Sequence, residues 1–511
     1  MTTLKYLSLT KSQRFVTNVG SFFKNFFKGI GRFFKGIPHR FYMLGRKIAH
    51  PFEVLADAWK KGSWQVRLNF LVFGFYQLLH KEVARGILYL LFEIVFIWFM
   101  IVAGGFYLGK LGSLGTFSGK STALYDVGNV SSSSIGGDES FFVLLYSLVT
   151  ILFIVIFIVL WYFSIRDARS LQNSYAVGKH SKNSQFFKDL LDSKYHTLLL
   201  AIPMVGLVAF TVIPIIFMII IGFTNYSTNH LFLFDWVGAA NYQNFFAGSG
   251  ASSGNNLISI FLRVLAWTLI WALIATFTNY FLGMAVALLI NKKGIKLKKL
   301  WRTVLILTIA VPQFVSLLLI QQMVNVGGFL NDLFVSAGWI AQNDTPFSNN
   351  VLLSRIIIIV VNMWVGVPYT MLISSGLLMN IPEDLYESAR IDGATPFKMF
   401  SAITLPYMLF ITGPYLLSQF IGNINNFNII YLLSQGYPQM ASLDSATIAT
   451  YGRVGETDLL ITWIYKMSME GSTKNYATAC VLGVLVFVVI AFFSLIFYGR
   501  SNSVKNEGDF Q

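Results

Sequence analysis

Neutral amide side chains stand inside apolar runs of this sequence, where each would need a polar partner. The run 405–434 contains Gln419, Asn423 and Asn426, and the last two are spaced so that they share one face of a helix. An unpaired amide in hydrocarbon costs several kcal/mol, so these groups must face a cavity or one another. Amides beside aromatic rings suit the hydroxyls and apolar faces of a sugar, but hydrogen bonding between helices explains them equally well.

Two other apolar runs carry groups of the same kind. The run 356–379 contains the stretch 364–369, in which Tyr369 supplies a phenol beside small residues. The run 301–324 contains Gln313 directly after a proline, and Ser316 three residues later. The candidate chemistry is therefore recognition of a neutral polar molecule by residues from three separate runs.

The titratable residues predict no enzyme. The six histidines lie in loops or near the ends of apolar runs, and none is paired with a carboxylate inside a run. Glu93 is the clearest acidic residue in an apolar run, and the later runs have no obvious one, which argues against a proton- or sodium-coupled carrier. The segment 115–121 superficially resembles a phosphate loop, but Leu114 stands where that motif needs glycine. We expect no ATP site and no catalytic residue in this chain.

A short polar island separates two of the apolar runs and is a candidate docking site for another protein. The island lies within 380–406 and follows 24 mostly apolar residues, 356–379. A glycine C-cap followed by a proline helix start would explain it as an ordinary solvated loop. The positions of interest are Glu387, Ala389, Asp392, Gly393, Ile403, Leu405 and Pro406.

The composition predicts the elements that position these groups. The chain has 511 residues, of which 55% are hydrophobic and only 12% are charged, whereas soluble domains have about 25% charged residues. We therefore predict an all-α polytopic membrane protein with about eight transmembrane helices, each long enough to cross a bilayer. The expected spans are 87–109, 139–165, 195–222, 264–290, 301–324, 356–379, 405–434 and 475–498.

Three local features qualify this topology. The seventh span is long and is expected to be interrupted near Gly413-Pro414 or Gly422. The apolar stretch 66–85 is short and is predicted to be a re-entrant or surface helix. The stretch 457–465, outside the spans, is predicted to be an amphipathic surface helix.

The basic residues fix the expected orientation. If the N-terminus is cytoplasmic and each span crosses once, 31 Lys and Arg fall on the cytoplasmic side and 7 on the other. This asymmetry follows the positive-inside rule, so both termini and the polar island are predicted to be cytoplasmic. The net charge of +15 is then explained by topology, without a nucleic-acid partner.

The ends of the chain complete the expected organisation. Paired phenylalanines alternate with cations in 22–35, a pattern that predicts a helix lying on anionic membrane lipids, although packing against the protein itself is an alternative. The single cysteine, Cys480, allows neither a disulfide nor a cysteine-based metal site within the chain. The predicted segments are a basic N-terminal region, an extension with two spans, a six-helix core and a cytoplasmic tail: 1–60, 61–190, 191–500 and 501–511.

The polar island resembles the EAA loop of ABC importer permeases. The agreement lies in Glu387, Ala389, Gly393, and the Ile403-x-Leu405-Pro406 that follows, with Ser388 where that family usually has alanine. The resemblance implies a short coupling helix that docks into a cleft of an ATPase subunit.

Residues 195–500 are also similar to the large permease of maltose and maltodextrin importers. The stretches 310–312, 366–369, 381–387 and 425–427 carry this likeness. The resemblance implies a sugar site midway across the membrane on Val365, Gly366, Tyr369, Asn423 and Asn426, with weaker matches at Gln313, Ser316, Gln419 and Gly422. An aromatic residue is expected at Gly422 and is missing, and the large external domain that some members insert after the third span is absent.

The resemblance further implies the partners and the location. They are a second homologous permease, two ATPase subunits that bind ATP and magnesium, and an extracytoplasmic sugar-binding protein, in a bacterial cytoplasmic membrane. This chain itself would bind no cofactor and no metal. We interpret it as a permease subunit for an oligosaccharide of the maltodextrin kind; the alternatives are another neutral sugar or a polyol, a secondary carrier, or a membrane scaffold or enzyme.

Overall fold

The structure is a computed structural model, and it describes most of the chain. The described residues are 50–115, 139–178, 188, 191–192, 195–247, 257–292, 294–441, 443, 445–470 and 474–500. The predicted interfacial segment 22–35, the segment 116–121 and the tail 501–511 lie outside them. Within the described residues the regular structure is helical, and the only extended pairing is two isolated bridges, Thr224 with Trp236 and Gln439 with Gly455. The all-α prediction is confirmed.

The chain divides into two compact units, which we describe separately. Unit 1 comprises Met1–Gly109 with Leu145–Phe210, and unit 2 comprises Lys110–Leu144 with Thr211–Gln511. The predicted division at residues 60, 190 and 500 stays a prediction.

Unit 1 contains a clamped pair of short helices, α3 (Trp64–Leu68) and α4 (Phe75–Leu79). The single helix predicted over 66–85 is therefore wrong, because Gly74 turns the chain in the left-handed region at φ 73°. Asn69 Nδ2 donates to the carbonyl and hydroxyl oxygens of Ser164, and the N–H of Phe73 donates to Glu93 Oε2. These bonds hold the turn against two long helices.

Those long helices carry the first two predicted spans. Helix α5 (Val83–Phe99) continues through a π-helical turn, η1 (Met100–Gly104), into α6 (Gly105–Lys110). Helix α7 (Ser140–Ala176) has 37 residues. Helix α9 (Tyr195–Leu207) begins the third span, which passes through η4 (Val208–Val212) into α10 (Ile213–Ile221).

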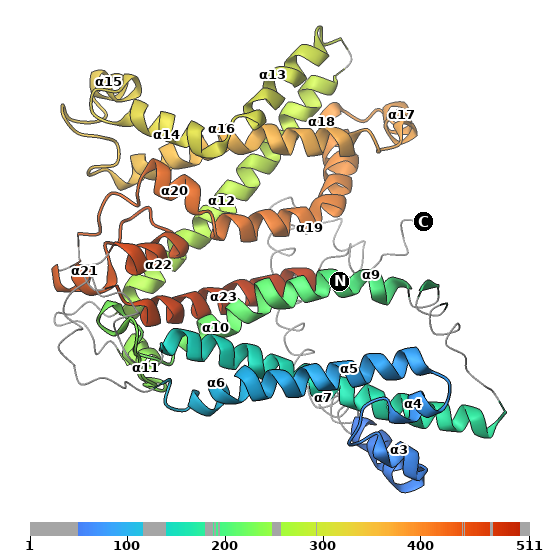
Figure 1. Cartoon of the computed structure of the whole chain (residues 1–511). Coiled ribbons are helices and arrows are strands. Elements are labelled where there is room, and N and C mark those ends of the chain that lie inside the picture. Colours follow the sequence, from blue (N-terminus) through green and yellow to red (C-terminus); the bar gives the residue numbers. More distant parts are fainter. Residues whose placement is uncertain are drawn as a thin grey trace, which may run out of the picture. The chain divides into compact units, whose positions relative to one another are not determined.

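Unit 2 is built around α12 (Leu257–Asn291), the helix that α16, α19 and α22 contact (Figure 1). The buried aromatic residues Trp267 and Trp271 of α12 join a core with Leu317, Ile358 and Ile430. The remaining helices of unit 2 follow: η5 (Thr228–His230), α11 (Ala240–Ala247), α13 (Lys298–Ala310), α14 (Gln313–Val324), α15 (Phe329–Ser336), α16 (Val351–Leu378), α17 (Glu383–Ile391), α18 (Pro396–Met399), η6 (Phe400–Thr404), α19 (Leu405–Ile424), α20 (Phe427–Leu433), α21 (Ser445–Tyr451), α22 (Leu460–Met469) and α23 (Tyr476–Arg500).

Seven helical stretches in the described residues are long and apolar enough to cross a membrane. They are Val83–Lys110, Ser140–Ala176, Leu199–Ile221, Leu257–Asn291, Val351–Leu378, Pro396–Leu433 and Tyr476–Ile496. Each overlaps one of the predicted spans. The eighth, predicted over 301–324, is a pair of helices bent by 87°, so the total is eight when that pair counts as one span.

The predicted surface helix over 457–465 is corrected by the structure. Helix α22 starts at Leu460, and its Leu460, Trp463 and Met467 belong to a buried core with residues of α12 and α23. Its amphipathic pattern therefore reflects packing inside unit 2.

Candidate functional site

A cavity of about 500 Å³ opens in unit 2 where two interrupted helices meet α12 and α16. This size falls within the range of about 300–1,000 Å³ that is usual for small-molecule sites. The lining residues are Asn279, Thr308, Ile309, Val311, Pro312, Gln313, Ser316, Asn362, Trp364, Val365, Gly366, Tyr369, Thr370, Gln419, Asn423 and Asn426.

The bend between α13 and α14 forms one wall. Val311 is extended (φ −81°, ψ 125°), as expected for a residue that precedes a proline, and Pro312 is also extended. The predicted continuous span 301–324 is therefore wrong, because the chain leaves the helix at this dipeptide. Exposed backbone at membrane depth is tolerated where it lines a cavity, and both residues do.

The interruption between α19 and α20 forms a second wall. Helix α19 runs through Gly413-Pro414 without a break, so that predicted position is wrong, but it ends at Ile424, which confirms the interruption predicted near Gly422. Helix α20 begins after Asn426, whose side chain accepts a hydrogen bond from the N–H of Ile429 at 3.4 Å. An asparagine is a strong N-cap, so it starts a new helix at the point where the cavity lies.

Helix α16 supplies the third wall with its aromatic residues. Trp364 and Tyr369 each expose 49% of their surface, so their rings are available to a ligand. Pro368 lies inside this helix and has no N–H, which removes the usual donor to the carbonyl of Trp364.

Eight of the nine predicted substrate residues line this one cavity. They come from three separate spans and are Gln313, Ser316, Val365, Gly366, Tyr369, Gln419, Asn423 and Asn426. Gly422 is not among the lining residues, and a Cβ added there would meet nothing within 4 Å. The space beside Gly422 is open where the resemblance leads us to expect an aromatic side chain.

The amides of the cavity differ in how much of their hydrogen bonding is already used. Asn423 Nδ2 donates to Thr276 Oγ1 at 2.9 Å, and the Asn423 carbonyl accepts from Trp271 Nε1 at 3.1 Å. Asn426 Nδ2 donates to Asn423 Oδ1 at 3.5 Å. Asn423 therefore bonds to α12 through its side-chain Nδ2 and its backbone carbonyl, as the explanation by bonding between helices requires, and it also lines the cavity.

The sequence analysis missed two amides that have unused atoms. Asn279 Oδ1 and Asn362 Nδ2 are buried and, among the described residues, have no hydrogen-bond partner. Both residues are single amides inside apolar runs, which is the signal that singled out Asn423. Thr308 and Thr370 were also missed as lining residues, and Trp364 was included only as part of the stretch 364–369.

The lining, all of it within the described residues, carries no carboxylate and no cation. Amides and hydroxyls offer both donors and acceptors, and the two exposed rings offer apolar faces. This combination suits an uncharged molecule with many hydroxyl groups.

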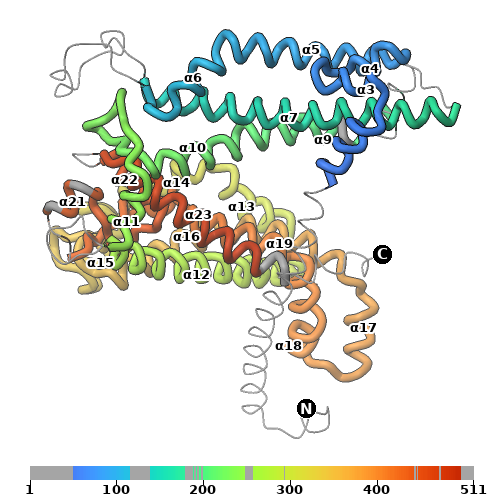
Figure 2. Tube along the Cα trace, turned by 90° about the horizontal axis from the view of Figure 1, so that it is seen from below, coloured from blue at the N-terminus to red at the C-terminus, as the bar shows by residue number. Residues whose placement is uncertain are grey.

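The polar island forms a second site, at the coupling-loop positions. Helices α17 and α18 project away from the rest of unit 2 (Figure 2). Glu387 and Ala389 lie on α17, Asp392 is its C-cap, and Gly393 follows at φ 73°. Ile403 lies in η6, and Leu405 and Pro406 begin α19.

Hydrogen bonds give this projection a defined shape. The N–H of Gly393 donates to the Arg390 carbonyl at 3.0 Å, which closes the end of α17. The hydroxyl groups of Tyr386 and Thr404 are 2.8 Å apart and connect α17 to η6.

Large apolar side chains are exposed on the projection. The exposed fractions are 47% for Leu385, 87% for Ile391 and 78% for Phe397. All three side chains are therefore accessible to another protein.

The basic residues Lys292, Lys298 and Arg302 lie between the end of α12 and the first turns of α13, at the same end of unit 2 as this projection. Asn291 at the end of α12 donates to Ser375 Oγ near the end of α16 (3.0 Å), and Arg302 donates to Asn291 Oδ1 (2.9 Å). Helix α16 leads directly into α17. These contacts place the basic residues and the projection at one end of unit 2; the side of the membrane that this end faces stays a prediction.

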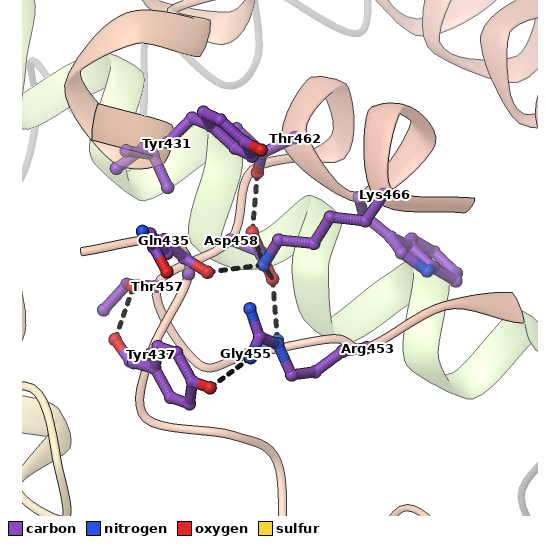
Figure 3. A network of polar contacts seen from close by, with 12 residues as sticks. Tyr431, Gln435, Tyr437, Arg453, Gly455, Thr457, Asp458, Thr462 and Lys466 are labelled. Atoms are coloured by element: carbon purple, nitrogen blue, oxygen red, sulfur yellow. Dashed lines mark hydrogen bonds and ion pairs between the residues drawn. The ribbon is translucent and has the colours of Figure 1, made fainter. Parts of the chain in front are cut away.

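The opposite end of unit 2 contains a buried ion pair (Figure 3). Lys466 Nζ lies 2.7 Å from Asp458 Oδ2 and donates to the Gln435 carbonyl at 2.6 Å. Asp458 also accepts from the N–H of Gly455 at 2.7 Å and from the Thr462 hydroxyl at 2.8 Å. Nearby, Glu456 pairs with Arg263 of α12 and Arg355 of α16. These contacts bind the 435–458 segment to α12, α16 and α22.

The chain is similar to known transport proteins. Residues 279–503 match the family model described as binding-protein-dependent transport system inner membrane component. The maltodextrin transport system permease protein MdxF of Bacillus subtilis is 31% identical over 452 residues, covering 85% of this chain and 94% of that protein. The galactooligosaccharides transport system permease protein GanP of Bacillus subtilis is 32% identical over 382 residues, covering 72% of this chain and 85% of that protein.

A solved structure is also similar. It is that of a bacterial ABC transporter involved in the import of the acidic polysaccharide alginate, with a TM-score of 0.48 and 21% identity, covering 63% of this chain and 100% of that chain. The matched segment 279–503 contains the three cavity walls and the projecting loop. With MdxF matched over almost its full length, this chain belongs to the family of binding-protein-dependent transport system inner membrane components, the permease subunits of ABC importers.

Proposed function

We propose that this chain imports a neutral oligosaccharide of the maltodextrin kind as one of two permeases that form the translocation path. The observation that carries the proposal is the cavity, whose amides, hydroxyls and rings come from three walls and include no charged group. The names of MdxF and GanP support an oligosaccharide as the substrate class. Family membership favours this function over a secondary carrier, a scaffold or an enzyme.

The proposed energy source is ATP hydrolysis by two partner ATPase subunits, which bind the ATP and magnesium. The projection formed by α17 and α18 would dock on one of them through its exposed apolar side chains. Pro406 and Leu405 connect this projection directly to α19, which carries Gln419 and Asn423 of the cavity. A displacement of the docked loop would therefore move one cavity wall.

The proposed setting is a bacterial cytoplasmic membrane with both termini in the cytoplasm. An extracytoplasmic binding protein would deliver the sugar to the end of unit 2 that holds the Asp458–Lys466 pair. The basic residues of loop 292–302 support this orientation.

The test is ATP-dependent uptake into proteoliposomes that contain the assembled importer and its binding protein. We expect labelled maltotriose to accumulate, because its hydroxyls match the neutral lining. An acidic trisaccharide of uronic acids should accumulate far less, since burying its charges without a counter-ion is costly. Accumulation of the acidic sugar at an equal rate, or uptake that needs a proton gradient in place of ATP, would contradict the proposal.

A further inference from the structure

Asn279 is the cavity amide that comes from α12, a helix that the sequence analysis did not connect with substrate. It lines the cavity, and its buried Oδ1 has no hydrogen-bond partner among the described residues. Most buried polar atoms in proteins are paired, so the unpaired Oδ1 indicates a missing partner, and the residue that carries it lines the cavity. Asn423 and Asn426, in contrast, already bond to each other and to neighbouring groups.

Gly366 determines whether Asn279 reaches the cavity. Helix α16 runs beside α12, and a Cβ on Gly366 would collide with the Asn279 amide nitrogen and lie 2.7 Å from its Cγ. One turn further along both helices, a Cβ on Gly283 would lie 2.6 Å from the Thr370 Cβ. The two helices therefore approach closely at two glycines, and the first glycine leaves room for the Asn279 side chain.

We propose that Asn279 is a substrate-binding residue that accepts a hydrogen bond from a sugar hydroxyl, and that Gly366 acts by leaving room for it. This inference rests on the proposed function, which supplies a polyhydroxylated neutral ligand. It adds α12 to the helices that bind the sugar. Gly366 then contributes to the site through the space that it leaves, in addition to lining the cavity.

The test is binding of radiolabelled maltotriose to the purified, assembled importer without its binding protein. Losing one hydrogen bond should weaken binding by roughly 2- to 12-fold in Asn279→Ala. Asn279→Leu keeps a similar volume between the helices but removes the acceptor, so it should weaken binding without loss of assembly. Thr278→Ala is the matched control, because the Thr278 hydroxyl bonds to its own helix at Ile274 and does not line the cavity.

A double mutant tests the role given to Gly366. Gly366→Ala should weaken binding by displacing Asn279, and it should have little further effect in the Asn279→Ala background, because the two changes remove the same contact. Independent, multiplying losses would show that Gly366 acts by another route and would overturn this part. Wild-type binding in Asn279→Leu would overturn the inference.

The outcomes separate the inference from the proposed function. If Asn279→Leu binds normally while Asn426→Ala binds weakly, the sugar occupies the cavity and only the role of Asn279 is wrong. If the wild-type importer binds no maltotriose at all, both the proposed function and the inference fail.

Discussion

Replacing Lys466 with methionine should destabilise unit 2 strongly. Lys466 is 1% exposed and Asp458 is 0% exposed in their side chains, so the substitution leaves a buried carboxylate without its counter-ion. Breaking a buried pair from one side costs about 3–5 kcal/mol in general. Asp458 keeps two hydrogen bonds, from Gly455 and Thr462, so we expect a loss at the lower end of that range.

A second substitution and the pH dependence identify the cause. Lys466→Met with Asp458→Asn removes both charges and should recover much of the lost stability. Burial raises the pKa of Asp458, while Lys466 and the hydrogen bonds from Gly455 and Thr462 lower it. Without Lys466 that pKa rises further, so the folded state binds the proton more tightly than the unfolded state does. The Lys466→Met mutant should therefore be more stable at acidic pH than at neutral pH, and it should lose stability as the pH rises through the folded-state pKa of Asp458.

The assay is thermal unfolding of the detergent-purified chain at pH 5 and pH 8. Lys474→Met is the matched control, since the backbone of Lys474 makes its hydrogen bonds with Thr228. Wild-type stability in Lys466→Met, or no recovery in the double mutant, would refute this reasoning.

Three further changes address the loop and the cavity. Gly393→Pro should abolish ATP-driven uptake while leaving the chain folded in the membrane, because proline cannot adopt φ 73° and removes the donor to Arg390; normal uptake would contradict the coupling role. Asn423→Ala with Asn426→Ala should cut uptake strongly, at about 0.5–1.5 kcal/mol for each lost sugar bond; wild-type uptake at matched expression would leave these amides only a structural role. Pro312→Ala should lower uptake, because alanine favours a helical conformation over proline by up to about 3 kcal/mol and would straighten the bend that lines the cavity. An unchanged uptake rate would show that the bend does not depend on proline.

The spans could be predicted because apolar length is a property of the sequence itself. Seven of them appear where hydropathy placed them, and the charges on loop 292–302 share an end with the projecting loop. The interruptions were harder to place. Pro414 stays inside α19, whereas the chain leaves the helix at Val311-Pro312, so a proline in an apolar run does not by itself mark an interruption.

Polarity inside apolar runs indicated six of the eight predicted residues that line the cavity, and the resemblance added Val365 and Gly366, whereas Asn279 required the structure. Its neighbour Gly366 is 87 positions away in the sequence, and no local pattern connects the two. The Asp458–Lys466 pair was missed for a related reason: a charged pair outside the spans reads as solvent-exposed until α22 is seen to be buried.

The most direct test of the account is the position of maltotriose in an electron cryo-microscopy map of the assembled importer. We predict sugar density in the cavity between the α13–α14 bend and the start of α20. A pyranose ring should lie within about 4 Å of Tyr369 or Trp364, the usual distance for contact. Sugar density elsewhere in the membrane region, with this cavity empty, would contradict the central claim.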